Sequence, residues 1–255
     1  MLSLTLRMQR TVIMRNLSAI ELYLELLKKT ILFEIWLEHE PGATKENRLQ
    51  GLDWPLIAHS MIGRIRMNNL HMLMNDVINN NVKGDFIETG VWRGGACIFM
   101  AGFLKAHNVR NRKVLVADSF EGLPKPDPQY PIDATSKFHE QDFLRVSLPE
   151  VQGNFKKYDL LDDNVVFLKG WFKDTLPTAP TDKIAIARLD GDMYSSTMDA
   201  LTNLYPKVSV GGYVIIDDYS IGYCAAAVHD FRAIHNITDP LVVIDITGVY
   251  WKKTK

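Results

Sequence analysis

The feature that most constrains the fold is an alternation, after Gly84, of short β-rich runs with longer helix-like stretches. Six runs are rich in β-branched and other apolar residues: DFIETG, KVLVADSF, NVVFLKG, KIAIARLDGD, GGYVIIDDY and LVVIDITGVYWKK. Such an alternation predicts βα units and a doubly wound, mostly parallel sheet with helices on both faces. The last run contains Gly248, which favours a terminal hairpin or an antiparallel edge strand. We therefore expect an α/β fold.

Helix-like stretches connect these runs and also precede them. Between the runs, helices are expected over residues 95–109, 148–160, 195–208 and 224–237. Upstream, apolar residues recur with the helical period from Ile20 to Leu37, and a second helix is expected from near Ile57 to Asn80. The charged stretch between these two helices contains Pro and Gly, and we expect it to be a mobile loop.

Length and composition favour a single domain. The chain has 255 residues, of which 47% are hydrophobic and 23% charged, enough for one sizeable core. We expect a helical extension over residues 1–80 and a sheet core over residues 84–255. The first stretch of the chain, with internal methionines Met8 and Met14, is interpreted either as a disordered leader or as an artefact of the start site.

Charge and cysteine content exclude several classes of partner. The formal net charge is -1, so no uniform positive field exists to bind nucleic acid or an anionic membrane. The N-terminal apolar segment is interrupted by Arg7, Arg10 and Arg15, among other charges, which argues against a membrane span. Cys97 and Cys224 lie far apart and belong to no ligand cluster. A reducing, cytoplasmic location fits this usage better than secretion.

A glycine-rich turn follows the first predicted strand. The segment Glu88–Gly95 reads ETGVWRGG and leads directly into a helix, so glycines stand where backbone must approach a ligand closely. Its G-x-x-x-G-G spacing differs from the G-x-G-x-x-G of dinucleotide enzymes. The turn predicts a nucleotide-binding site, with a tight strand-to-helix connection that binds no ligand as the alternative.

Carboxylates stand at the ends of the later strands. Asp118 ends the second run, where nucleotide-binding α/β domains place an acceptor for ribose hydroxyls; it could instead cap a loop. Asp190, Asp192, Asp217 and Asp218 end two further runs. Because parallel strands end at one edge of the sheet, these groups should meet there, and carboxylates without His or Cys suit Mg²⁺ or Mn²⁺. Alternatively, they cap helices and pair with basic residues such as Arg188.

Five long motifs resemble those of the macrocin O-methyltransferase family: ETGVWRGGACIF, ADSFEGLPKPD, LKGWFKDTLPTAP, RLDGDMYSSTMDAL and GGYVIIDDY. The resemblance runs from about Ile20 to Trp251 and includes AHSMIG and the closing GVYWKK. It implies a Rossmann-like class I fold that binds S-adenosylmethionine. It also implies an Mg²⁺-dependent O-methyltransferase acting on a sugar hydroxyl of glycosylated natural products such as macrolides and aminocoumarins.

The same resemblance implies a set of site residues. The metal would lie on Asp190, Asp217 and Asp218, and the general base would be His139, whose residue type titrates near neutral pH. The cofactor would contact Ser60, Met61, Glu88, Thr89, Gly90, Val91, Trp92, Gly94, Asp118, Ser119, Gly170 and Trp171. A metal that chelates two neighbouring sugar hydroxyls would lower the pKa of the attacking one and orient it.

Other functions remain as alternatives. A nicotinamide oxidoreductase would need a different glycine turn and would leave the acidic residues without a role. A metal-dependent catechol O-methyltransferase would also chelate a diol, and a non-catalytic partner protein could bind the cofactor alone. Relatives imply a homo-oligomer, a dimer or tetramer, that uses the N-terminal helices.

Overall fold

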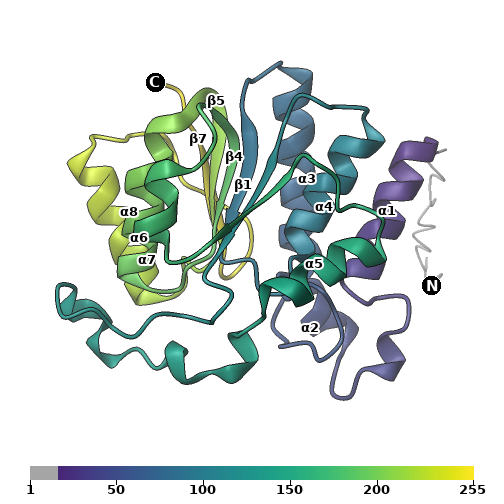
Figure 1. Ribbon diagram of the computed structural model, residues 1–255, viewed down its shortest axis with the longest axis horizontal. Coiled ribbons are helices and arrows are strands. Elements are labelled where there is room, and N and C mark those ends of the chain that lie inside the picture. The colour runs from purple at the N-terminus through teal and green to yellow at the C-terminus, as the bar shows by residue number, and fades with distance from the viewer. Residues whose placement is uncertain (1–16) are drawn as a thin grey trace, which may run out of the picture.

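The computed structural model describes residues 17–255, so the predicted leader lies outside the described residues. Within these residues, seven strands form one sheet in the order β3-β2-β1-β4-β5-β7-β6 (Figure 1). The first five strands run parallel, and β7 pairs antiparallel with β5 and with β6. Their bounds are β1 (Asp85–Thr89), β2 (Val114–Asp118), β3 (Val165–Lys169), β4 (Ile184–Leu189), β5 (Val208–Ile216), β6 (Val242–Val243) and β7 (Val249–Lys252). The expected doubly wound, mostly parallel sheet is confirmed, with the C-terminal hairpin at its edge.

Helices cover both faces of the sheet. Helices α1, α3, α4 and α5 lie on one side in Figure 1, and α6, α7 and α8 lie on the other. Their bounds, with that of α2, are α1 (Ala19–Ile31), α2 (Lys45–Gln50), α3 (Gly63–Asn79), α4 (Gly95–Ala106), α5 (Leu148–Lys157), α6 (Phe172–Thr175), α7 (Tyr194–Leu204) and α8 (Gly222–Ile234). The helices expected between the strands are present, and each ends a few residues earlier than the apolar pattern suggested.

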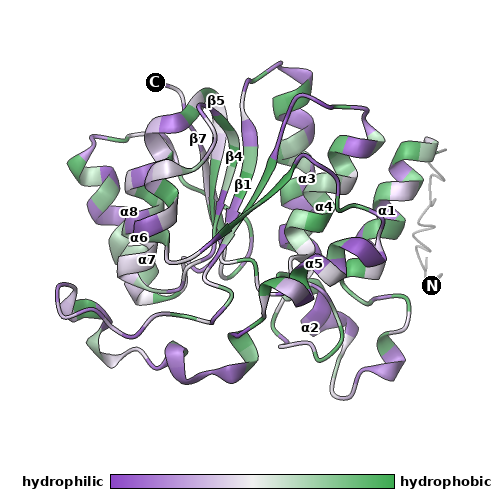
Figure 2. Cartoon of the chain, in the orientation of Figure 1, coloured by the Kyte–Doolittle hydropathy of each residue, from purple (hydrophilic) through white to green (hydrophobic). Residues whose placement is uncertain are grey.

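Two apolar cores sandwich the sheet. One unites α1, α3, α4 and α5 with the strands, and the other unites α7 and α8 with the opposite face. All six residues of β4, the strand at the centre, are buried. Figure 2 shows the matching pattern, with hydrophobic residues along the central strands and hydrophilic residues gathered on the helices and loops around them. Because α1 and α3 share a core with the strands, the N-terminal extension packs as part of the sheet's own covering layer.

The N-terminal extension differs from the prediction in its boundaries. Helix α1 begins at a capping box made by Ser18 and Glu21 but ends at Ile31, before the predicted Leu37. Helix α3 begins at Gly63 and not near Ile57. The expected loop between them contains α2, which Thr44 caps at one end and Gly51, with φ 66°, ends at the other.

A buried arginine holds this segment in place. The Arg48 side chain is 1% exposed and bonds Glu40 at 2.6 Å and Asp53 at 2.7 Å. A buried guanidinium must keep its hydrogen-bonded carboxylate partners, because a buried charge without them is costly. The segment predicted to be mobile is therefore tied down at its centre.

A long loop crosses the edge of the sheet at which the parallel strands end. Residues 119–147 connect β2 to α5 through three short 3-10 helices, and Figure 1 shows them running across one end of the molecule. Asp133, fully buried, anchors this loop by accepting hydrogen bonds from the backbone amides of Tyr194 (2.8 Å) and Ser195 (2.9 Å) at the start of α7. Among the helices of residues 17–255, none is long and apolar enough to cross a membrane.

Candidate active site

A cavity of about 560 Å³ opens at the carboxyl ends of the parallel strands, the edge where α/β sheets bind ligands. Most residues of the predicted site line it: Ser60, Met61, Glu88, Gly90, Val91, Trp92, Asp118, Ser119, Gly170, Trp171, Asp190, Asp217 and Asp218. Thr89, Gly94 and His139 do not. The glycine turn and the acidic residues thus share one space.

The glycine turn after β1 owes its shape to a close approach of two backbones. Gly90 has φ 77°, and a Cβ on it would lie 1.7 Å from the carbonyl oxygen of Asp190. Gly94, with φ 85°, is the N-cap residue of α4, and a Cβ there would lie 2.8 Å from Val151 Cγ1. Because Gly94 has no Cβ, Val151 of α5 can pack against the turn. Because Gly90 has none, the turn can approach the backbone of Asp190, which follows β4.

Asp118 fixes the turn from the neighbouring strand. Its carboxylate accepts the backbone N–H of Val91 at 2.8 Å and that of Phe120 at 2.7 Å. Burial raises the pKa of Asp118, although these hydrogen bonds oppose the shift. The sequence left ligand binding and loop capping open for this residue. In the structure it caps two backbone segments and also lines the cavity.

Three carboxylates converge on the cavity. One oxygen from each of Asp190, Asp192 and Asp218 lies within 4.8 Å of the others. Burial, followed by the Asp217 charge, raises the pKa of Asp190 to about 6. Burial, followed by the Asp190 charge, raises the pKa of Asp192 to about 8, and burial and neighbouring carboxylates raise that of Asp218. Mutual repulsion and burial of crowded carboxylates produce shifts in this direction.

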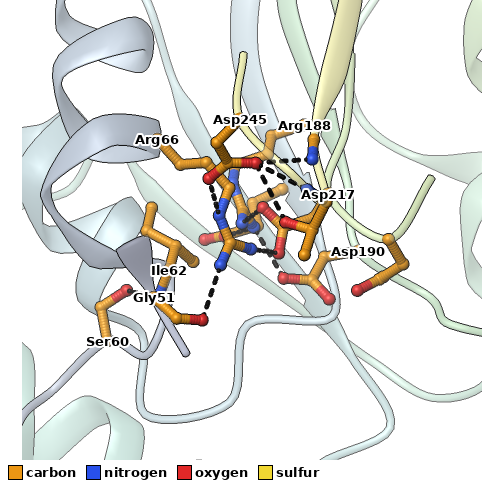
Figure 3. A network of polar contacts seen from close by, with 12 residues as sticks. Gly51, Ser60, Ile62, Arg66, Arg188, Asp190, Asp217 and Asp245 are labelled. Carbon is orange, nitrogen blue, oxygen red and sulfur yellow. Dashed lines mark hydrogen bonds and ion pairs between the residues drawn. The ribbon is translucent and has the colours of Figure 1, made fainter. Parts of the chain in front are cut away.

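Asp217 points away from this group and into a buried ion-pair network (Figure 3). One carboxylate oxygen pairs with Arg188 on β4 and the other with Arg66 on α3. Burial alone would raise the pKa of Asp217, but the two guanidinium groups outweigh burial and lower it. Arg66 also lies 3.1 Å from Asp245, which joins the N-terminal extension to the loop before β7.

Arg188 is the centre of the network. It pairs with Glu88 and, at 2.9 Å, with Asp190, in addition to Asp217. Glu88 also accepts a hydrogen bond from Cys97 Sγ at 2.8 Å, and burial raises the pKa of Glu88 to about 7. The sequence raised pairing with Arg188 as an alternative role for the acidic residues, and this pairing is present beside the converging group.

His139 lies in the loop over the cavity, in the short 3-10 helix Phe138–Glu140. Its ring is mostly buried, Nε2 lies 3.9 Å from Glu140, and Nδ1 has no hydrogen-bond partner within residues 17–255. The adjacent Phe138 lines the cavity, whereas His139 does not. In this conformation the imidazole is beside the site but does not face it.

Several site residues escaped the sequence analysis. Arg66 had no local signal, because its partner Asp217 lies 151 positions along the chain. Asp199 lines the cavity from α7, and burial raises its pKa to about 6. The latter could have been found, because Ser195, Ser196 and Asp199 share one helical face that follows directly from the acidic turn.

Comparisons with known proteins show the family of this chain. The macrocin-O-methyltransferase (TylF) family model matches residues 39–253. The chain belongs to the macrocin O-methyltransferase family. It is 49% identical to mycinamicin III 3''-O-methyltransferase of Micromonospora griseorubida, over 93% of this chain and 98% of that protein. It is 51% identical to demethyldecarbamoylnovobiocin O-methyltransferase of Streptomyces niveus, over 92% and 94%.

Solved structures support the same assignment. The structure of the O-methyltransferase NovP matches with a TM-score of 0.90 and 52% identity, covering 92% of this chain and 100% of that chain. An O-methyltransferase from Bacillus cereus in complex with S-adenosylhomocysteine shares the fold, with a TM-score of 0.50 and 14% identity over 89% of this chain and 100% of that one. This family member is an S-adenosylmethionine-dependent O-methyltransferase with the expected Rossmann-like class I fold.

Proposed function

We propose that this enzyme methylates a sugar hydroxyl of a glycosylated natural product, of the macrolide or aminocoumarin kind. The observation that carries the proposal is the single cavity in which the glycine turn and a group of carboxylates meet. The names of the relatives support the acceptor class, since they cite mycinamicin III, demethyldecarbamoylnovobiocin and a rhamnosyl-tetracenomycin. A compact polar acceptor could then lie between the methyl donor and the carboxylates.

The cofactor would occupy the part of the cavity nearest β1 and β2. There the turn from Gly90 to Trp92 supplies a closely approaching backbone, and the pair Asp118–Ser119 supplies a carboxylate and a hydroxyl. These groups suit a ribose and an amino-acid moiety, and S-adenosylmethionine supplies the methyl group. Ser60, Met61, Gly170 and Trp171 line the same cavity and complete the proposed contacts.

A divalent metal fits the neighbouring carboxylates. The donors are all carboxylate oxygens, which favours Mg²⁺ or Mn²⁺ over zinc, and their crowding is relieved by a cation. We propose Asp190, Asp217 and Asp218 as ligands. Each Asp217 oxygen has a second lone pair besides the one that faces an arginine. When bound, the metal would lower the pKa of the attacking hydroxyl.

The experiment that tests this function is a methyl-transfer assay. The purified protein would be given S-adenosylmethionine, Mg²⁺ and a panel of O-demethylated macrolide and aminocoumarin glycosides, with simple catechols in parallel. Methylation of a glycoside at the sugar, absent for catechols, is the expected result. Methylation of catechols, with no glycoside accepted, would contradict the proposed glycoside acceptor and assign a catechol in its place.

Metal affinity should depend on pH. A cation binds ionised carboxylates, and the pKa values of Asp190 (about 6) and Asp192 (about 8) are raised, so protons must leave this buried group when a cation binds. The affinity for Mg²⁺ should therefore rise from pH 6 to pH 8.5. Calorimetric titration with MgCl₂ in two buffers of different ionisation enthalpy measures both affinity and proton release; an affinity independent of pH would contradict this expectation.

We also propose His139 as the general base, a role that requires its loop to turn the ring toward the acceptor. His139→Ala should then lower kcat by about two to four orders of magnitude. Lys137→Ala, an exposed position in the same loop, is the matched control and should leave kcat nearly unchanged. An unaltered kcat in the histidine variant would show that this side chain takes no part in proton transfer.

We also propose that the protein is a homodimer or homotetramer and that it lies in the cytoplasm. Helix α1 supports the first, because Leu22 (57% exposed) and Leu26 (53%) leave an apolar strip on its outer face. Light scattering coupled to size exclusion measures the assembly directly. A monomer at micromolar concentration would contradict it.

A further inference from the structure

A cluster of ring and guanidinium groups stands at the wall of the cavity. Phe143 stacks on Trp54, with ring centroids 5.2 Å apart and planes 8° from parallel. Its other neighbour is Trp92, at 5.3 Å. The Arg93 guanidinium lies 4.1 Å above the Trp92 ring and 5.6 Å from that of Phe143. We refer to Trp54, Trp92, Arg93 and Phe143 as the aromatic clasp.

The aromatic clasp joins three segments that are far apart in sequence. Trp54 precedes α3, Trp92 and Arg93 belong to the glycine turn, and Phe143 belongs to the loop of residues 119–147. The Trp92 indole N–H donates to the Phe143 carbonyl at 3.0 Å. Arg93 adds hydrogen bonds to the backbone carbonyls of the Trp54 segment, at Pro55 (3.2 Å) and Ala58 (2.9 Å).

Within the clasp, Trp92 lines the cavity and Phe143 does not. Trp92 also has φ 47°, a left-handed conformation that is uncommon for a bulky residue and needs support from its surroundings. The Phe143 ring supplies that support from outside, by packing against the Trp92 indole at an interplanar angle of 37° and by stacking on Trp54. Its side chain therefore affects a bound molecule indirectly, through the neighbouring rings of Trp92 and Trp54 that line the cavity.

We propose that Phe143 is a positioning residue that sets the affinity for the cofactor by holding Trp92 in the cavity wall. The proposal rests on the cofactor position given above. A displacement of the loop of residues 119–147 would remove the Phe143 ring and the acceptor of the indole N–H together. Loop position and cofactor affinity are thereby coupled.

Calorimetric titration with S-adenosylhomocysteine tests the proposal. Phe143→Ala should weaken binding about tenfold, since it removes two aromatic contacts, and Phe143→Tyr, which keeps the stacked ring, should restore wild-type affinity. Trp54→Ala should weaken binding about threefold. Trp36→Ala is the matched control, because Trp36 is 47% exposed against 51% for Trp54 and packs only on Phe33 among described rings.

A double variant separates coupling from independent contacts. Trp54 itself lines the cavity, so its loss could act directly on the cofactor. If both residues act through one clasp, Trp54→Ala combined with Phe143→Ala should bind no more weakly than Phe143→Ala alone. Effects that multiply would show that Trp54 acts on the cofactor directly and not through Phe143, and equal affinity in the wild-type protein and Phe143→Ala would overturn the proposal.

A measurement without any ligand completes the test. Lys137 and Arg145 are exposed trypsin sites in the loop that Phe143 holds, so Phe143→Ala should be cleaved there faster than wild type or Trp36→Ala. Unchanged cleavage would overturn the positioning role even if affinity fell. A wild-type protein that binds no S-adenosylhomocysteine would instead overturn the cofactor position, with loop cleavage still reporting on the clasp.

Discussion

Replacing Arg188 by methionine should lower the free energy of unfolding by about 3–5 kcal/mol at pH 8. The side chain is 2% exposed and is the shared partner of Glu88, Asp190 and Asp217. Methionine has a similar length but leaves these three carboxylates buried without their cation. Arg66 still pairs with Asp217, so Glu88 and Asp190 bear most of the cost.

The pH dependence of this loss identifies its origin. Carboxylates that have lost the arginine can avoid a buried charge by binding protons as the pH falls, and the Glu88 pKa is already raised to about 7 by burial. The destabilisation should therefore shrink between pH 8 and pH 5.5. Urea unfolding at both pH values measures it. Arg145→Met is the control, since Arg145 is exposed and lies 3.6 Å from Asp142; it should cost less than about 0.5 kcal/mol. An equal, pH-independent loss in both variants would refute this account.

The sheet was predictable because each of its strands and helices is marked by a pattern of neighbouring residues. Each buried strand is a short apolar run, and each helix repeats its apolar residues with the helical period, so order and type follow from the sequence alone. The N-terminal extension and the loop of residues 119–147 follow other rules. Arg48 fixes the first through Glu40 and Asp53, and Asp133 fixes the second at the start of α7. Neither anchor leaves a periodic signal, so a segment expected to be mobile is held in place.

The site was predictable to the extent that strand ends meet. The glycine turn and the acidic residues share a cavity because parallel strands end at one edge. The pairing of Asp217 with Arg66, 151 positions away, left no signal in the sequence. Asp217 and Asp218 are neighbours at the end of β5, where successive side chains face opposite ways. Asp217 accordingly meets arginines while Asp218 meets Asp190 and Asp192.

Asp217→Asn should lower Mg²⁺-dependent turnover about a thousandfold, equivalent to about 4 kcal/mol of lost transition-state stabilisation. The amide keeps the shape of the carboxylate and an oxygen that can face Arg188, but it removes the negative charge that a metal ligand supplies. Binding of S-adenosylhomocysteine should stay within about threefold of wild type. Calorimetry with MgCl₂ should report lost metal affinity independently of turnover.

Asp192→Asn is the matched comparison, and it decides which carboxylate is the third ligand. Asp192 lies in the converging group, whereas Asp217 is the residue that the family resemblance implies. If Asp217 is the ligand, the Asp192→Asn variant should keep most of its Mg²⁺ affinity. The substitution then removes only a neighbouring carboxyl group, whose pKa is raised to about 8. The reverse pattern, with metal affinity lost in Asp192→Asn and kept in Asp217→Asn, would assign Asp217 to the arginine network alone. The buried pairs with Arg66 and Arg188 would then serve to align β5, and the metal would lie on the three carboxylates that already converge.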